Sequence, residues 1–478
     1  MVSETIRKEK SKENTIWWRR LLICFFALMI VIVFYFLPPP AGLSHNGLVM
    51  IGIMIMGMIL WITEPIPFAA TGLLVIMIQP IMGVMQAQEV FASFGNQAIF
   101  FLIGAFIIAG AIEKYGLHRR IALRLLTIFS QKPKMLSFGI MISCVFLSFI
   151  IPEHAVAALF LPIITSILIA IKITPRKSNF GKVCMLSVAY GCSIGSLGTL
   201  IGGARNPLTI TILSNLSPPI TVTFFDWMIY SMPIVFISFP LVWLILQFTF
   251  PIEIVDMEEA RKEIKHQVHA VGKFDKKEAM VLGIVLFTTI LWVFFSSSQY
   301  YGLAISALIG SSLLFFSGLL TWKDVEKRVP WGVILLYGGA ITLGFGMQQT
   351  GAGAWIAHSL FSISGGHQYL VILGLIILSV VLTEFMSNVA AVAILLPIGL
   401  GVATQIPGIS PLIASMIIAL GAGLAFMLVI STPGNTITYS SGYYSSRDLL
   451  RAGILSNVIC ISVIFLIAIF YWKGVLGL

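Results

Sequence analysis

Long apolar runs recur from one end of the chain to the other. Each holds roughly 16 to 23 residues and is long enough to cross, or nearly cross, the ~30 Å hydrocarbon core of a bilayer as a helix. The clearest are residues 21–36, 47–62, 228–250, 280–295 and 454–472. Because the runs are continuous and do not alternate with polar residues, they predict helices rather than a barrel. The sequence therefore predicts an all-α polytopic membrane protein.

Composition agrees with a membrane protein and gives no sign of an enzyme. Hydrophobic residues make up 58% of the chain and charged residues only 10%, which excludes an ordinary soluble domain. The five cysteines lie in apolar surroundings without metal-like or paired spacing, so we expect them to be core residues. No nucleotide-binding loop, zinc spacing or hydrolytic triad is present, so we expect no enzyme and no organic cofactor.

Lysine and arginine residues gather in six clusters, which hold all of them except Arg205 and Lys473. The clusters are residues 7–20, 114–134, 172–182, 261–277, 323–328 and 447–451. The positive-inside rule then predicts a multi-pass protein of the plasma (cell inner) membrane with a cytoplasmic N-terminus and an external C-terminus. Contact with anionic lipid accounts for the formal charge of +10, so we expect no nucleic-acid partner.

A polar interruption lies between the second and third basic clusters. About 37 mostly apolar residues separate two clusters that are both expected inside, and Pro152-Glu153-His154 lies near their middle. A re-entrant helical hairpin over about 134–172, entering from the cytoplasmic side and turning at Pro152, fits this pattern. Non-helical backbone at that depth is tolerated only beside protein or water, so we expect the tip to line a cavity.

The second half of the chain repeats this pattern. Residues 367–405 carry Ser387-Asn388 near the middle and enter from the outside in the predicted topology. A shift of 235 residues aligns Pro152 with Ser387 and Glu153 with Asn388. A Gly/Pro/Thr/Asn break follows each hairpin, "GGARNP" at 202–207 and "STPGN" at 431–435. Broken helices at matching positions, entering from opposite faces, indicate an inverted-repeat secondary transporter.

These features divide the chain into four parts. Residues 1–45 are expected to form an N-terminal cytoplasmic segment and a first span. Residues 46–252 form the first repeat, 253–278 a cytoplasmic linker helix and 279–478 the second repeat. The linker carries "EEARKEIK", whose charges are spaced for pairing on a helix.

Several segments together resemble the divalent anion/sodium symporters of the ion transporter superfamily, which carry dicarboxylates, citrate or sulfate. They are the two hairpin tips, "WITEPIPFAATGLL" at 61–74, "AIEKYGLHRRIAL" at 111–123, "WGVILLYGGA" at 331–340 and "LVISTPGNTI" at 428–437. The resemblance implies a homodimer of protomers with about 11 transmembrane helices. Each protomer would have a scaffold and a transport domain that moves as an elevator.

The resemblance also implies site residues. In that family each tip reads Ser-Asn-Thr and binds substrate carboxylates, and each tip with the break after it holds one sodium ion. The second ion site maps to Thr383, Met386, Asn388, Ser431 and Thr432. The first site keeps Ser148, but Pro152, Glu153 and His154 replace Ser-Asn-Thr, and Val389 replaces the second threonine. The loss of both threonine hydroxyls argues against ordinary dicarboxylate recognition.

An ionisable group at mid-membrane depth is presumed functional, and its partner should be identifiable. Glu153 and Arg205 are the expected pair, and we interpret the guanidinium as a substitute for the first sodium ion. The alternative is an ion pair that only locks the loops. His154 is either a substrate donor or proton carrier, or simply a satisfied polar group. The expected substrate-binding residues are Glu153, His154, Arg205, Asn206, Ser387, Asn388, Val389, Pro433 and Asn435.

Two other glutamates have structural interpretations. We expect Glu64 to anchor a scaffold turn at the inner surface. Glu384 either lies beside the second ion site or caps a hairpin helix.

The predicted function is secondary active transport of a small anion, either a di- or tricarboxylate or an inorganic oxyanion. Coupling is predicted to sodium at the retained second site or to exchange with another anion. The alternative is a cation/proton antiporter of the same superfamily that uses Glu153 as its proton site.

Overall fold

A computed structural model describes residues 2–253, 256–296, 300–364, 367–406 and 408–478. Every regular element within these ranges is a helix, as the apolar runs predict. Ten of these helices are long and apolar enough to cross a membrane, and four shorter apolar helices accompany them. The prediction of an all-α polytopic fold is therefore confirmed.

Two series of ten helices follow the first helix in the described chain, with one helix between the series. The first helix is α1 (Val2–Phe36), and the intervening helix is α12 (Glu258–Val271). The first series is α2 (His45–Thr63), α3 (Phe68–Ile81), α4 (Ala87–Phe94), α5 (Gln97–Lys114), α6 (Leu117–Phe129), α7 (Pro133–Leu147), α8 (Glu153–Ala170), α9 (Asn179–Gly195), α10 (Arg205–Ser214) and α11 (Phe224–Thr249). The second series is α13 (Lys276–Phe295), α14 (Gly302–Phe316), α15 (Trp322–Arg328), α16 (Trp331–Gln349), α17 (Ala352–Ser364), α18 (Gln368–Phe385), α19 (Asn388–Gln405), α20 (Pro411–Gly421), α21 (Pro433–Tyr439) and α22 (Ser446–Leu466), which continues into the π-helical segment η1 (Ile467–Lys473).

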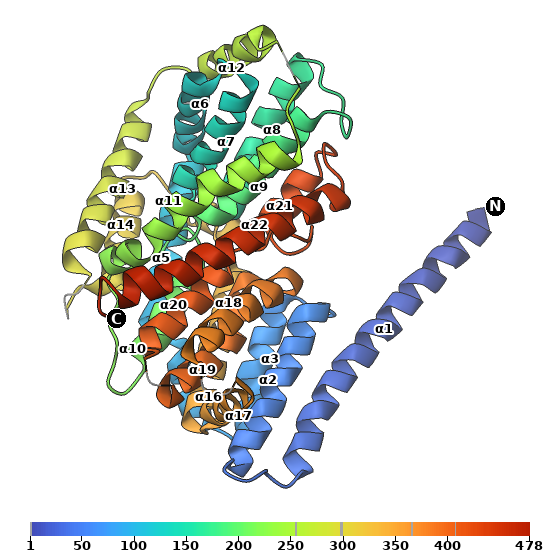
Figure 1. The fold of residues 1–478 in the computed structure, drawn as a ribbon, viewed down its shortest axis with the longest axis vertical. Coiled ribbons are helices and arrows are strands. Elements are labelled where there is room, and N and C mark those ends of the chain that lie inside the picture. The colour runs from blue at the N-terminus through green and yellow to red at the C-terminus, as the bar shows by residue number, and fades with distance from the viewer. Residues whose placement is uncertain (1, 254–255, 297–299, 365–366, 407) are drawn as a thin grey trace.

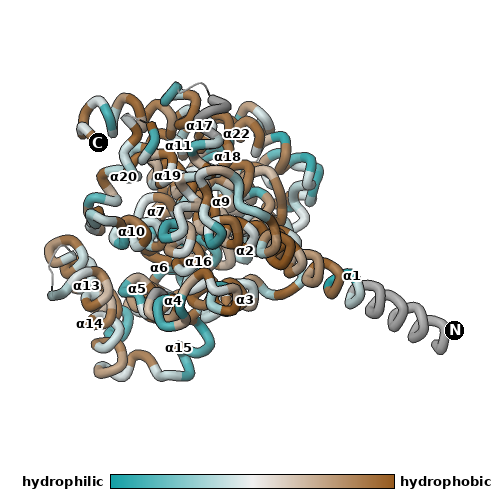
Figure 2. Tube along the Cα trace, turned by 90° about the horizontal axis from the view of Figure 1, so that it is seen from below, coloured by the Kyte–Doolittle hydropathy of each residue, from teal (hydrophilic) through white to brown (hydrophobic). Residues whose placement is uncertain are grey.

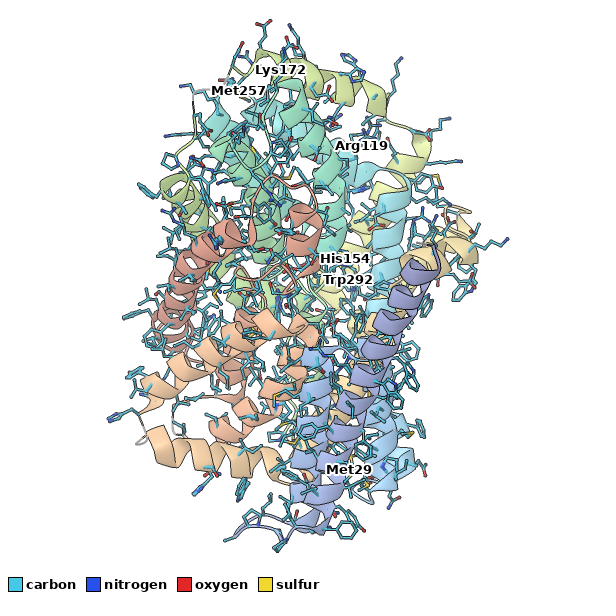
Figure 3. The ribbon with its side chains drawn as sticks, turned by 90° about the vertical axis from the view of Figure 1, so that its right-hand side faces the viewer. Met29, Arg119, His154, Lys172, Met257 and Trp292 are labelled. Carbon is cyan, nitrogen blue, oxygen red and sulfur yellow. The ribbon has the colours of Figure 1, made fainter. Side chains whose placement is uncertain are left out.

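The two hairpins occupy matching places in the two series. Helices α7 and α8 lie in the upper part of Figure 1 with α12, whereas α18 and α19 lie in the lower part. Figure 3 shows His154, at the first tip, midway along the molecule, while Lys172 and Met257 lie at the end near α12. Proline has no N–H to continue a helix, which suits Pro152 to the residue before α8. At the second tip the Ser387 hydroxyl caps α19 by accepting a bond from the Ala390 amide (3.3 Å).

Each hairpin is followed by a helix that is interrupted. The chain between α9 and α10, residues 196–204, forms the first break, and residues 422–432 between α20 and α21 form the second break. The linker helix α12 lies inside the range expected for the linker, of which residues 254–255 fall outside the described chain. Helix α13 begins at Lys276, slightly before the boundary drawn at 279.

The helices form two groups that pack mainly within themselves. We call α2–α5 and α13–α16 the scaffold helices, in which α14 packs on α5 and α16 on α3. We call α7–α11 and α18–α22 the tip helices, in which α7 packs on α9 and α11 on α22. Helix α1 packs on α2, and its described part extends beyond the other helices (Figure 2).

Two further helices connect these groups. Helix α6 is tied to the scaffold by Arg120, whose guanidinium binds the Glu278 carboxylate of α13 at 2.8 Å. Helix α17 is tied to the loop before α2, because Trp355 Nε1 donates to the Ala41 carbonyl (3.1 Å). Helix α17 also crosses the tip helix α19 with almost no side chain between them. A Cβ at Gly353 would lie 2.6 Å from the Pro397 carbonyl oxygen, and one at Gly401 would overlap the Gly353 carbonyl.

Candidate functional site

Both tips and both breaks line one cavity of about 610 Å³. These four segments are far apart in the sequence, and the two repeats contribute two each. The scaffold supplies the remaining wall. The lining residues are Ile62, Thr63, Glu64, Phe68, Phe106, Pro152, Glu153, His154, Gly202, Gly203, Ala204, Arg205, Val333, Leu336, Phe385, Met386, Ser387, Asn388, Val389, Ile430, Ser431, Pro433, Thr436 and Ile437.

Three of the tip helices with ten or more residues begin at this cavity. They are α8, α10 and α19, whose first residues Glu153, Arg205 and Asn388 all line it. The N-terminal end of a helix carries partial positive charge and unpaired backbone N–H groups. The cavity is therefore suited to an anion, and an anion there would face amide groups from both repeats.

The Arg205 guanidinium lies between the two breaks and is 1% exposed. Its Nε donates to the Ala419 carbonyl in α20 (3.1 Å), and its Nη2 donates to the Ser196 hydroxyl in the first break (2.9 Å). Gly203 and Gly423 pass so close that a Cβ at either would collide with the guanidinium. A permanent cation thus joins the C-terminal ends of two interrupted helices, where the backbone carbonyls are negative.

The expected direct pair between Glu153 and Arg205 is not formed. In the described ranges no carboxylate oxygen lies within 4.0 Å of the Arg205 guanidinium. The guanidinium instead donates to the Ser196 hydroxyl, which in turn donates to the Ser193 carbonyl (2.7 Å). Glu153 and Arg205 both line the cavity, so their opposite charges still attract each other there without direct contact.

The first tip and the start of α10 also contain oxygens without donors. Glu153 Oε2, Ser148 Oγ and Asn206 Oδ1 are buried and have no hydrogen-bond partner. His154 lines the cavity beside Glu153. Buried polar oxygens normally find a partner, so these atoms leave room for a proton, a cation or a substrate group at the first tip.

The second tip gathers oxygen atoms from three segments. Thr383 Oγ1 lies 2.8 Å from Asn388 Oδ1 and 2.8 Å from the Ala422 carbonyl oxygen. One hydroxyl proton cannot serve both acceptors at once. Carbonyl, amide and hydroxyl oxygens at a break are ligands that suit sodium. Ala422 was not predicted from the sequence, since nothing in the sequence marks one backbone carbonyl among its neighbours.

The other residues expected at the second ion site have different contacts. Met386 and Ser431 line the cavity, and the Ser431 hydroxyl donates to the Leu428 carbonyl (2.7 Å). The Thr432 hydroxyl accepts from the Asn435 amide (3.1 Å), which caps α21. Among the described residues no group of three His, Cys, Asp or Glu side chains could hold a metal ion.

Asn206 and Asn435 lie behind the cavity rather than in its wall. Asn206 Nδ2 donates to the carbonyls of residues 196 and 199, and Asn435 Nδ2 donates to those of residues 425 and 428. Each position in the first set is 229 residues before its counterpart in the second. The two asparagines therefore clamp the two breaks in the same way. The repeated spacing was the signal that could have identified them as structural.

Glu384 holds the second break by its backbone. Its fully buried carboxylate accepts from the amides of Phe426, Met427 and Leu428 at 2.8 to 3.0 Å, and from Asn457 Nδ2 at 3.0 Å. Three successive amides directed at one carboxylate fix the shape of the segment. Glu384 therefore caps the break, whereas the sequence suggested either the ion site or a hairpin helix.

The remaining expected residues all line the cavity, namely Ser387, Val389 and Pro433. Four residues that the sequence did not single out contact these groups, namely Ser196, Ala419, Ala422 and Gly423. Three of them act through backbone atoms or through having no side chain, so residue type alone does not reveal them.

Sequence comparison places this arrangement among known transporters. A family model described as the sodium:sulfate symporter transmembrane region matches residues 14–478. The sodium-dependent dicarboxylate transporter SdcS of Staphylococcus saprophyticus is 30% identical over 464 residues, which cover 91% of this chain and 88% of that protein. SdcS of Staphylococcus aureus is 29% identical over 465 residues with the same coverage.

Two solved structures share the fold at low sequence identity. The YdaH transporter of Alcanivorax borkumensis has a TM-score of 0.53 and 14% identity, covering 81% of this chain and 88% of its own. MtrF of Neisseria gonorrhoeae has a TM-score of 0.57 and 12% identity, covering 89% and 95%.

Proposed function

This chain belongs to the family of the sodium:sulfate symporter transmembrane region, and on that premise we propose that it carries a small anion across the plasma membrane, coupled to sodium. The relatives named as sodium-dependent dicarboxylate transporters make a di- or tricarboxylate the first substrate class to test. Inorganic oxyanions are the second.

One observation carries the proposal: the N-termini of three tip helices, drawn from both repeats, meet at a single cavity, with a buried guanidinium beside it. Asn388 adds a side-chain amide in the wall of that cavity, because its Oδ1 is held by Thr383 (2.8 Å) and its Nδ2 is left for the substrate. Such a pocket binds an anion through directed donors without a resident metal.

We propose that one sodium ion accompanies the anion at Thr383, Asn388 and the Ala422 carbonyl. Arg205 stands in for a second sodium ion, because it supplies one positive charge at the carbonyl ends of two interrupted helices. A fixed cation cannot dissociate with the substrate. The coupling ratio would therefore be lower than in a relative that binds two ions.

We further propose an elevator motion in which the tip helices move against the scaffold helices. The crossing of α17 and α19 supports it, because α17 is tied to the loop before the scaffold helix α2 and few side chains lie between α17 and the tip helix α19. A homodimer joined through the scaffold, with the N-terminus in the cytoplasm, completes the proposal.

Uptake by proteoliposomes tests this function. Radiolabelled succinate, citrate and sulfate are offered with an inward sodium gradient, with equal sodium, and with unlabelled anion preloaded. Sodium-driven uptake is expected, and uptake that needs only internal anion would indicate exchange. Arg205→Ala is expected to abolish uptake, whereas Arg124→Ala, which removes an exposed arginine on α6, is expected to have no effect. Wild-type-like uptake by Arg205→Ala would refute the role of the guanidinium.

The unpartnered Glu153 Oε2 favours one alternative, a cation/proton antiporter that protonates this carboxylate. Such an antiporter would exchange protons for sodium ions across the membrane without added anion. A pH-sensitive dye inside the same liposomes detects this activity directly.

A further inference from the structure

Glu64 adopts a backbone conformation that glutamate seldom takes. It ends α2 with φ 43° and ψ 47°, in the left-handed region that favours glycine or asparagine. Its own amide donates to the Leu60 carbonyl (3.0 Å), which closes the helix. A non-glycine residue held there at an energetic cost is a reason to look for a function.

The turn that follows is rigid and fixes where this side chain lies. Pro65 and Pro67 restrict the backbone, and Trp61 Nε1 donates to the Phe68 carbonyl (3.3 Å) across the turn. Structural needs alone would be met by glycine at position 64. The chain instead places a carboxylate on a rigid part of the scaffold.

That carboxylate lines the cavity that the two tips share, and it is exposed. In the described chain it has no ion pair and no side-chain hydrogen bond. The other charged groups of the wall, Glu153 and Arg205, belong to the tip helices. Glu64 is therefore the charge that the scaffold contributes to the wall around an anion or a sodium ion bound at the tips.

Resting on the proposed function, we propose that Glu64 is a specificity-determining residue that weakens binding of the anion and strengthens binding of sodium on the side of the membrane where α2 ends. Because Glu64 is on the scaffold, the repulsion acts only while the tips are beside it. It thus promotes release of the anion on that side, which is cytoplasmic in the orientation predicted from the basic clusters.

The size of the effect follows from Coulomb's law. A sphere of the cavity's volume, about 610 Å³, is about 10 Å across. One unit charge acting on a dianion at ~10 Å, with an effective dielectric constant of about 50 to 80, changes affinity about fourfold to tenfold. The sodium effect is about half as large on a logarithmic scale and has the opposite sign.

The test compares inside-out and right-side-out vesicles that carry wild type, Glu64→Gln or Glu64→Asp. Glutamine keeps the backbone strain and removes only the charge, and aspartate keeps the charge. Glu326→Gln, an exposed glutamate on α15 away from the cavity, is the matched control.

At the face with Glu64, the KM of Glu64→Gln for the anion is expected to fall about fourfold to tenfold and its KM for sodium to rise about twofold to threefold. Glu64→Gln should have wild-type KM values at the opposite face. Glu64→Asp and Glu326→Gln should have wild-type KM values at both faces. Unchanged KM values in Glu64→Gln, or a rise in both, would overturn the inference. Absence of anion transport by wild type would instead refute the proposed function, and this inference with it.

Discussion

Removing the Glu384 carboxylate should loosen the second break before it affects anything else. In Glu384→Ala the amides of residues 426, 427 and 428 lose their acceptor, and Asn457 loses its partner. Nothing else in the described chain accepts from these amides. The carbonyl of Ala422, in the same segment, would then no longer be held near Thr383.

The magnitude follows from the number of bonds. Hydrogen bonds to a charged group contribute about 1.5 to 3 kcal/mol each, and four are lost. Two of the three backbone amides are only partly buried, so water recovers part of the loss, and a total of about 3 to 5 kcal/mol is expected. Glu384→Gln keeps one acceptor oxygen but points an N–H₂ group at an N–H donor, so about half of that loss is expected. Asn457→Ala loses one bond and about 1 to 2 kcal/mol.

Thermal unfolding of the purified variants in one detergent, together with the sodium KM for uptake, provides the assay. The apparent Tm should fall in the order Asn457→Ala, Glu384→Gln, Glu384→Ala. The sodium KM should rise with it, and the anion KM should change less. A Glu384→Ala protein with wild-type Tm and wild-type sodium KM would refute the view that this carboxylate shapes the break.

Three further predictions concern other contacts. Thr383→Val keeps the shape but removes the hydroxyl between two oxygens, so the sodium KM should rise about tenfold or more while the protein remains folded; uptake at varied sodium measures it. Gly423→Ala places a Cβ 2.6 Å from Arg205 Cζ, and displacing the guanidinium should lower uptake about tenfold, whereas Gly283→Ala, with open space around it, should have no such effect. Lys114, which binds Asp324 at 2.8 Å, holds the pKa of Asp324 below its ordinary value of 3.8. The stability from this depressed pKa is present above about pH 4 and is lost as the pH falls further, so Asp324→Asn should have a lower Tm at pH 7 and a flatter acid limb in a Tm-against-pH series.

The hairpins could be predicted because their tips break a physical rule. Glu153 and Asn388 are polar groups within apolar runs, which a bilayer tolerates only at a site of special structure. The cavity wall could be predicted in the same way, because each tip and each break carries polar or helix-breaking residues.

Partners inside the site could not be predicted in the same way. Arg205 was expected to bind the nearest carboxylate in the pattern, but it binds a hydroxyl and a backbone carbonyl of the other repeat. Every residue has a carbonyl, so the sequence does not say which one a guanidinium reaches. Asn206 and Asn435 were expected in the wall because they are polar, yet their Nδ2 groups donate to the breaks that they hold.

Under the proposed elevator motion, the close crossing of α17 and α19 gives a way to slow transport. At Gly353 and Gly401 the two main chains touch with no side chain between them. A single added methyl group would therefore hinder the movement of one helix past the other. Such a protein would bind its cargo normally and still turn over slowly. In that proposed mechanism affinity is set at the cavity and speed at this crossing, so substitutions at these two glycines would change the rate of transport and leave substrate choice alone.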